Sequence, residues 1–157
     1  DVSSLTLDLA DLSSVKRCAR QLRNELDKID VLMLNAGVMA IPERSITADG
    51  FEAHMGINHL GHFALTGLLL PLLQRAPLAR VVSVSSAAHM FGDLDFQDIM
   101  LANEGNYERW RAYGNSKLAN ILFVRGLAAR LGSQDASIVP VACHPGVCRT
   151  ELGRSVR

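Results

Sequence analysis

The sequence predicts an α/β fold, a doubly wound parallel sheet in one domain that spans residues 1–157. Strand-like and helix-like patterns alternate along the chain, which favours parallel strands joined by helical crossovers. The apolar runs typical of buried strands end at glycine or small polar residues, as parallel strands do before a turn. With 157 residues, 48% of them hydrophobic, the chain is long and apolar enough for one globular core.

The first three elements occupy the first 37 residues. Residues 4–9 alternate apolar and polar side chains, which predicts a short strand ending near Asp8. Residues 11–26 carry apolar side chains at intervals of three and four, the pattern of an amphipathic helix. Residues 30–34 are compact and apolar and stop at Asn35-Ala36-Gly37. They therefore predict a buried parallel strand followed by a glycine turn.

The rest of the chain continues the alternation. A long helical stretch is predicted over residues 47–74, although its middle, residues 56–62, is rich in glycine and polar groups that cost helix stability. Something local must compensate that cost. Three further elements follow: a strand at residues 80–84, a helix at residues 112–131 and a strand at residues 137–143.

The strand ends predict where a ligand would bind. In open parallel sheets the ligand crevice lies beyond the carboxyl ends of the strands. Four short motifs each follow a predicted strand, namely Asp8, Asn35-Ala36-Gly37, Ser85-Ser86 and Pro145-Gly146. We expect these motifs to meet at one edge of the sheet.

Composition excludes several other function classes. Lys plus Arg and Asp plus Glu number 16 each, so no net field attracts nucleic acid, and we expect no nucleic-acid partner. The longest apolar run, residues 64–73, contains Pro71 and is far short of the ~20 residues of a membrane helix. We therefore expect no membrane span in this segment. Cys18, Cys143 and Cys148 form no CxxC spacing and indicate a reducing compartment.

The five histidines do not predict a metal site. His59 and His62 fall at helical spacing, but no cysteine or carboxylate completes a plausible ligand set around them. We expect no metal.

Tyr113 and Lys117 form the central chemical pair of the sequence. Four residues apart on a helix, they share a face with Cβ atoms about 5–6 Å apart. A phenol has a pKa near 10, and a nearby cation favours its ionised form, so Lys117 is expected to lower the pKa of Tyr113. Taken alone, such a pair is more often a surface pair on an amphipathic helix.

Ser86 and Asn58 change the interpretation of that pair. Ser86 lies just past a buried strand, where its hydroxyl could hydrogen-bond a substrate oxygen beside the phenol, although an isolated serine there would be a turn residue. Asn58 lies in the glycine-rich helical stretch. It could bend the helix or free a backbone carbonyl to hold a water on a proton path to Lys117, and a satisfied buried amide is the alternative.

Together these motifs resemble the short-chain dehydrogenase/reductase family, whose Rossmann-like fold carries them in the same order. The residues that carry the resemblance are Asp8-Leu9, Asn35-Ala36-Gly37, Asn58, Ser86, Tyr113 with Lys117, and Pro145-Gly146. Residues 56–63 and 113–122 look like the retinol dehydrogenase and WW-domain oxidoreductase branch of that family.

The resemblance implies a role for each residue. Tyr113 would be the general acid/base, Ser86 would orient the reacting oxygen, and Asn58 would hold a relay water. Lys117 would lower the pKa of the phenol and bind the nicotinamide ribose.

The cofactor contacts are implied in the same way. Asp8 with Leu9 would reach the adenine edge, and the backbone of Asn35, Ala36 and Gly37 would line the adenosine ribose. Val147 and Thr150, after Pro145 and Gly146, would contact the nicotinamide carboxamide, while Tyr113 and Lys117 would contact the nicotinamide ribose side. The implied cofactor is NADP(H), with NAD(H) as the alternative, the implied substrate is a small lipophilic alcohol or carbonyl, and the full-length protein would be a homodimer.

The resemblance also predicts an incomplete sheet. The family's TGxxxGxG turn does not occur in the sequence, and in the strand order 3-2-1-4-5-6 the first strand here would be strand three. Strands one and two and the last strand would be missing, so we expect a partial domain that is poorly stable and inactive alone. Two alternatives are a catalytically idle Rossmann-fold binding or scaffold protein and, more weakly, a sugar-nucleotide epimerase that shares the Tyr-x-x-x-Lys pair.

Overall fold

Three parallel strands form the sheet of the computed structural model, which describes residues 2–132, 137–146 and 152. Strands β1 (Val31–Leu34), β2 (Ala79–Val84) and β3 (Ile138–Cys143) pair in the order β1-β2-β3. Leu34 lies opposite Ser83, and Val84 lies opposite Cys143. The predicted parallel α/β fold is therefore confirmed, with its strands in the order expected of strands four, five and six.

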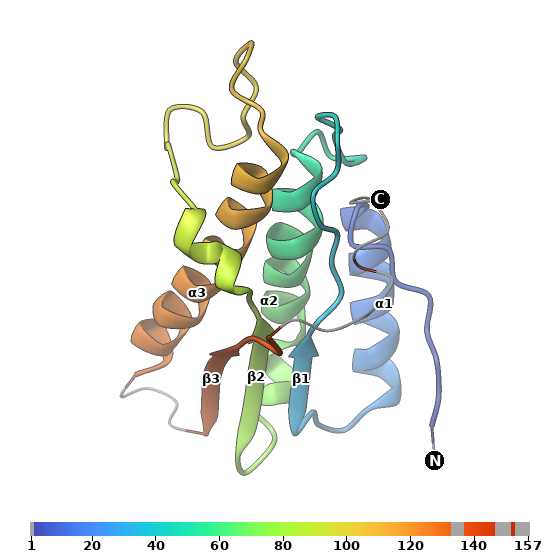
Figure 1. Cartoon of the computed structure of the whole chain (residues 1–157). Helices are drawn as coiled ribbons and strands as arrows, with labels where there is room; N and C mark the ends of the chain where they lie inside the picture. The colour runs from blue at the N-terminus through green and yellow to red at the C-terminus, as the bar shows by residue number, and fades with distance from the viewer. Residues whose placement is uncertain (1, 133–136, 147–151, 153–157) are drawn as a thin grey trace.

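Helices pack on one face of this sheet. The α-helices are α1 (Leu12–Glu25), α2 (Gly61–Leu73) and α3 (Arg109–Leu131), and two short elements, the π-helix η1 (Met55–Leu60) and the 3-10 helix η2 (Ala87–Phe91), precede α2 and α3. Figure 1 shows the three α-helices side by side, with α2 and α3 against the strands and α1 against α2. All three strand arrows point to the end of the molecule where the loops after β1 and η2 lie.

Leucines from α2 form the centre of the core. Leu69, Leu72 and Leu73 are buried, and they pack with Val15 of α1 and Leu34 of β1. Leucine truncation in such a core costs about 2–5 kcal/mol, so this cluster fixes how α1 and α2 sit against the sheet.

The opposite face of the sheet carries apolar side chains at its surface. Strand register places Val31 level with Val139, and Met33 level with Val141. These four side chains keep exposed fractions of 53, 38, 62 and 36% respectively. Side chains alternate between faces along a strand, so this surface faces away from α2 and α3. We call these four residues the open sheet face.

Residues 4–9 do not form the predicted strand. The segment is extended but belongs to no ladder among the described residues. Alternation alone cannot make a strand, because a strand also needs a neighbour to bond its backbone groups. Instead Leu9 is buried in the core, and the backbone N–H of Asp8 donates to Ser14 Oγ at 3.0 Å.

The predicted helix over residues 47–74 is also shorter and more varied than expected. Residues 47–52 form a turn closed by a bridge between Ile46 and Glu52, and the helical backbone starts at Ala53. The Glu52 carboxylate accepts from the amides of His54 and Met55 at 2.9 and 2.8 Å and so caps the helix. The glycine-rich middle is the π-helix η1, a form that often occurs at functional sites.

One helical stretch among the described residues, Met55–Leu73, is long and apolar enough to cross a membrane, with a mean hydropathy of 1.2. This helical stretch is longer than the apolar run of residues 64–73, from which the sequence predicts no membrane span. Half of the stretch is buried inside the protein, and its leucines form the core described above. That burial is typical of a core helix.

Candidate active site

Ser86 and Tyr113 meet at the carboxyl end of β2. Tyr113 lies in the second turn of α3 with only 3% of its surface exposed, and its hydroxyl lies close enough to the Ser86 side chain for the serine to lower the pKa of the phenol. Ser86 caps η2, because its Oγ accepts from the amide of Ala88 at 3.2 Å. The predicted proximity of the serine and the phenol is therefore present in the structure.

Glycine at position 114 allows that meeting. A Cβ placed on Gly114 would lie 2.8 Å from the carbonyl oxygen of Ala88, closer than real Cβ contacts come. α3 and η2 therefore approach backbone to backbone, and this close packing sets Ser86 beside Tyr113. Ser85 has a different role, because its buried Oγ donates to the backbone oxygen of Lys117 at 2.7 Å. Of these two adjacent serines, Ser86 is the one whose side chain lies beside the phenol.

Lys117 is buried beneath the same phenol. Its Nζ lies 5.7 Å from the centroid of the Tyr113 ring and donates to the carbonyl oxygen of Val84 at 3.0 Å. Burial lowers the pKa of Lys117 to about 8. An ammonium has three N–H donors, so the bond to Val84 leaves donors for a further partner.

The pKa of Tyr113 differs from the expectation. Burial raises it, and the hydrogen bond with Ser86 opposes that rise without reversing it. Lys117 was expected to lower this pKa below its ordinary value, and in this structure the desolvation of the phenol outweighs any such effect. The phenol is therefore a protonated donor at neutral pH.

Asn58 joins η1, the loop after β1 and α3. Its Oδ1 accepts from the amide of Val38 at 2.8 Å, and its Nδ2 donates to Val38 O at 3.0 Å and to Ser116 Oγ at 2.9 Å. Ser116 Oγ in turn donates to the carbonyl oxygen of Tyr113 at 2.7 Å. The side chain is thus a satisfied buried amide, one of the two interpretations that the sequence left open, and it ties the loop to the helix that carries the phenol.

His62 is a site residue that the sequence analysis missed. Its Nδ1 lies 3.0 Å from the carbonyl oxygen of Asn58, to which it donates. Burial lowers the pKa of His62 to about 4; the bond to Asn58 opposes this shift, and the charges of Lys117 and His59 add to it. His62 is therefore neutral at physiological pH. The spacing of four residues from Asn58 was the signal available, since it places both on one helix face.

Glu52 and His54 form a second buried group beside the phenol that the sequence did not reveal. His54 Nδ1 lies 2.8 Å from Glu52 Oε1, and His54 Nε2 accepts from the amide of Ile41 at 3.2 Å, so the ring proton is on Nδ1. Burial acts to raise the pKa of Glu52, but the hydrogen bonds from His54 and Met55 lower it overall. The His54 ring packs edge-on against Tyr113, with centroids 6.1 Å apart.

The turn after β1 approaches this cluster closely. A Cβ on Gly37 would lie 2.8 Å from Asn58 Oδ1 and 3.7 Å from Lys117 Nζ, so only glycine fits there. Asn35 and Ala36 precede it and are exposed at the carboxyl end of the strand. This motif is brought to the active site as predicted, with its backbone open to a ligand.

The two residues expected at the adenine edge lie apart from this cluster. Asp8 is exposed, and its Oδ1 accepts from the amide of Ala10 at 2.8 Å. Leu9 is a buried core residue, so its side chain serves packing.

The turn after β3 lies at the same sheet edge as Ser86. Pro145 and Gly146 are exposed, Gly146 has a φ of 74°, and its amide donates to His144 Nδ1 at 3.2 Å. The amide of Ser85 donates to Cys143 O at 2.8 Å, which holds the two strand ends together. Val147 and Thr150 lie outside the described residues.

The described histidines are used within the protein. Besides His54 and His62, His59 Nδ1 lies 3.2 Å from Asn120 Oδ1 and His89 Nδ1 lies 2.7 Å from Ser86 O. Among the described residues there is no group of three or more His, Cys, Asp or Glu side chains that could hold a metal ion.

The parallel α/β sheet and α3 thus bring a serine, a phenol and an ammonium together near the carboxyl end of β2. The family model described as short chain dehydrogenase matches residues 1–96. The chain belongs to the short-chain dehydrogenase family.

The relatives and solved structures agree with this assignment. Human retinol dehydrogenase 12 is 51% identical over 148 residues, which cover 94% of this chain and 45% of that protein. Human retinol dehydrogenase 13 is 44% identical over 153 residues, covering 98% of this chain and 45% of the relative. The chain therefore spans about half the length of the curated relatives it matches.

Two solved structures extend the comparison. An uncharacterized protein from Mycobacterium paratuberculosis is 46% identical, with a TM-score of 0.80 over 95% of this chain and 52% of that one. The NADPH-bound carbonyl reductase from chicken fatty liver is 25% identical, with a TM-score of 0.67 over 94% of this chain and 58% of that one.

Proposed function

We propose that this chain carries the catalytic centre of an enzyme that transfers hydride between NADP(H), or alternatively NAD(H), and a lipophilic alcohol or carbonyl compound. The single observation that supports this most strongly is the proximity of the Ser86 side chain to the buried phenol of Tyr113, with the Lys117 ammonium 5.7 Å from the centroid of the phenol ring. The bound nicotinamide would supply the hydride.

Tyr113 and Ser86 act on the substrate oxygen. In the reductive direction both hydroxyls donate to the carbonyl oxygen, and the Tyr113 proton passes to that oxygen as the alcohol forms. The raised pKa of Tyr113 supports this direction, because it keeps the phenol protonated at neutral pH. Oxidation would require the phenolate and is therefore expected to gain with rising pH.

Lys117 and Asn58 serve that proton transfer from behind the phenol. Lys117, with a pKa of about 8, would use its remaining N–H donors for the nicotinamide ribose. The carbonyl oxygen of Asn58 accepts from His62 and has a second lone pair for a water that continues a proton path to Lys117.

The open turns fit a dinucleotide. Gly37 lets the turn pack closely against Asn58 and Lys117. Asn35 and Ala36 before it are exposed, so a ligand could lie on them next to the site. Pro145 and Gly146 provide a second exposed turn at the same edge. NADP(H) is favoured because the chicken carbonyl reductase contains NADPH.

A lipophilic substrate is supported by the surroundings of the phenol and by the relatives. Trp110, 39% exposed, packs edge-on against Tyr113 with ring centroids 6.4 Å apart and gives the site an apolar border. The similar human proteins are named retinol dehydrogenases.

The test uses the complete protein that contains these residues, assayed for NADPH consumption with retinal and a panel of aldehydes and ketones. Tyr113→Phe should lower kcat by about 100-fold or more, the usual contribution of a positioned general acid, and leave the Kd for NADPH within a few-fold. Equal turnover by the wild type and Tyr113→Phe would remove the phenol from the mechanism.

The sequence offers a matched control, because Tyr107 is its other tyrosine. The Tyr107 hydroxyl donates to Ile41 O at 2.7 Å, and burial raises its pKa to about 12. Tyr107→Phe removes the same atom from a structural position, so its kcat should stay within a few-fold of wild type.

A further inference from the structure

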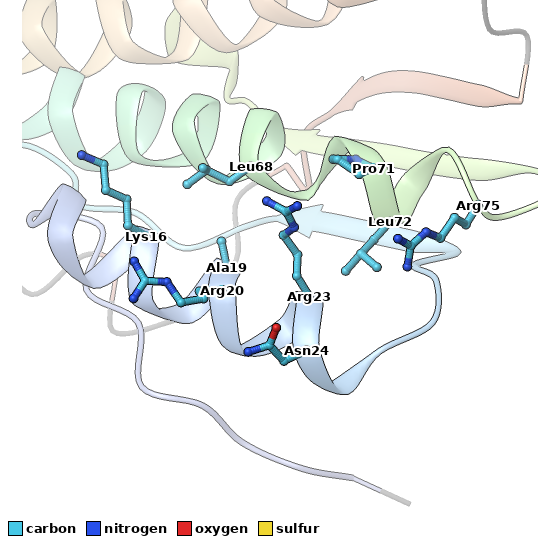
Figure 2. Close-up of a pocket in the computed structure, with 9 residues that line it drawn as sticks. All are labelled: Lys16, Ala19, Arg20, Arg23, Asn24, Leu68, Pro71, Leu72 and Arg75. Carbon is cyan, nitrogen blue, oxygen red and sulfur yellow. The ribbon is translucent and has the colours of Figure 1, made fainter.

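A cationic cavity lies between α1 and α2 and shares no lining residue with the candidate active site. It has a volume of about 560 Å³ and opens to solvent (Figure 2). Lys16, Arg20 and Arg23 line it from α1, and Arg75, just beyond the end of α2, lines it from the opposite side. We call this cavity the basic groove.

The cations of the basic groove share one helix face. Lys16, Arg20 and Arg23 follow one another at intervals of four and three residues, so their side chains project together. Figure 2 shows the Arg23 guanidinium reaching from α1 to the level of Leu68 and Pro71 on α2. Like charges held this close repel one another unless an anion lies between them.

No such anion is supplied by the described part of the chain. Within residues 2–132, 137–146 and 152, the four groove cations take part in no ion pair with a carboxylate. Arg75 donates to the backbone oxygen of Asp27 at 3.3 Å, a bond that leaves its charge uncompensated. Guanidinium groups pair with both carboxylate and phosphate oxygens. A phosphate group has three acceptor oxygens and more than one negative charge, so it is the anion that can engage three arginines at once.

The base of the groove is apolar. Ala19 and Leu72 are buried there, each 1% exposed, and the apolar surface that reaches solvent belongs to the half-buried Leu68 and the exposed Pro71 on α2. An inorganic ion would leave the surface of Leu68 and Pro71 in contact with water, whereas a ligand with an apolar part would cover it.

We propose that the basic groove binds an amphipathic phosphate, a phosphate group attached to an apolar body, with the phosphate held by Arg20, Arg23 and Arg75. The apolar body would lie on Leu68 and Pro71. The proposal does not depend on the catalytic role of Tyr113, because the groove shares no residue with that site.

The test titrates the complete protein with dihexanoyl phosphatidic acid below its micelle concentration, by calorimetry, with NADP⁺ present to fill the proposed cofactor site. Arg20→Glu with Arg23→Glu should weaken binding by about tenfold or more, since it reverses two charges at the ligand. Arg20→Gln with Arg23→Gln should give a smaller loss. The control, Arg125→Glu with Arg130→Glu, makes the same charge change at exposed positions on α3 and should stay within about twofold.

Two further arms define the ligand. Inorganic phosphate should bind at least about tenfold more weakly than dihexanoyl phosphatidic acid, because it leaves the apolar base uncovered. Co-sedimentation with phosphatidylcholine vesicles containing phosphatidic acid distinguishes a membrane lipid from a soluble ligand. Binding in solution alone assigns a soluble ligand, and binding in both arms assigns a membrane lipid.

Three results would overturn the proposal. The first is no binding of phosphatidic acid either in calorimetry or in co-sedimentation. The second is equal affinity for the lipid in Arg20→Glu with Arg23→Glu and in the α3 control, and the third is equal affinity of the protein for inorganic phosphate and for dihexanoyl phosphatidic acid. Circular dichroism melts of each variant show whether it is folded, and the exposed positions of Arg20 and Arg23 make retention of the fold the expected result.

Discussion

Acidification should destabilise this protein through one buried histidine. His62 is 5% exposed, and its pKa falls from 6.5 to about 4 on folding, chiefly because burial disfavours the charged ring. The folded protein therefore binds this proton less readily than the unfolded chain. The resulting stability is fully present above about pH 6.5 and is lost as the pH falls toward 4.

The size of the effect follows from the same two pKa values. At about 1.36 kcal/mol per pH unit, the whole difference corresponds to roughly 3 kcal/mol. At about pH 5 the unfolded histidine is almost fully protonated while the folded one remains neutral, so about 2 kcal/mol of that total should be gone.

The assay compares the free energy of unfolding of the complete protein and of His62→Asn, by urea denaturation at about pH 7.5 and about pH 5. Asparagine retains an N–H donor for Asn58 O but does not titrate, so the variant should lose about 2 kcal/mol less than the wild type on acidification. Carboxylates such as Glu52 contribute equally to both proteins. An exposed histidine serves as control, and His144→Asn should follow the wild type. If His62→Asn loses as much stability as the wild type, the inference of a neutral buried His62 is wrong.

Three further substitutions or titrations test the site. Gly114→Ala should destabilise the protein by about 1–3 kcal/mol in a thermal melt and lower kcat, because the added Cβ would lie 2.8 Å from Ala88 O. The control is Gly67→Ala in α2, where the space around the glycine is open. This variant should be neutral or stabilising by up to about 1 kcal/mol. Glu52→Gln should lower the free energy of unfolding, measured by urea denaturation, by about 2–3 kcal/mol. The reason is that the N–H₂ group of glutamine would face one of the backbone N–H groups that now donate to the carboxylate. Unchanged stability would contradict a capping role for Glu52. The affinity for NADPH, measured by fluorescence titration, should fall as the pH rises through about 8, where Lys117 loses its charge. The affinity of Lys117→Met should not change over the same pH range. If it does change, a group other than Lys117 is responsible for the pH dependence.

Most helices and strands could be predicted because their signals are local. The periodicity of residues 11–26 and 112–131 and the apolar run at 30–34 agree with α1, α3 and β1 to within three residues at each end. Residues 4–9 were predicted wrongly because a strand depends on partners elsewhere in the sheet. The π-helix could not be predicted as such. The sequence indicated only that the glycine and polar residues at 56–62 cost helix stability, whereas the contacts of this segment with α3 and with the loop after β1 are visible only in the structure.

The candidate active site could also be predicted only in part. Tyr113, Lys117 and Ser86 converge because parallel strands deliver their carboxyl ends to one edge. His62, Ser116 and the Glu52–His54 pair could not be predicted, because their roles are hydrogen bonds between segments far apart in sequence. The sign of the Tyr113 pKa shift likewise depends on how deeply the ring is buried, which spacing alone does not reveal.

The open sheet face has a consequence for how variants of this protein should be sought. Val31, Met33, Val139 and Val141 lie on β1 and β3, the two strands that pair with β2, and they face away from α2 and α3. Because β2 leads to Ser86, a substitution that shifts β1 or β3 can also shift this serine relative to the Tyr113 phenol. Screens for altered turnover should therefore include this far side, where a lost methyl group can slow the reaction without touching a reactant.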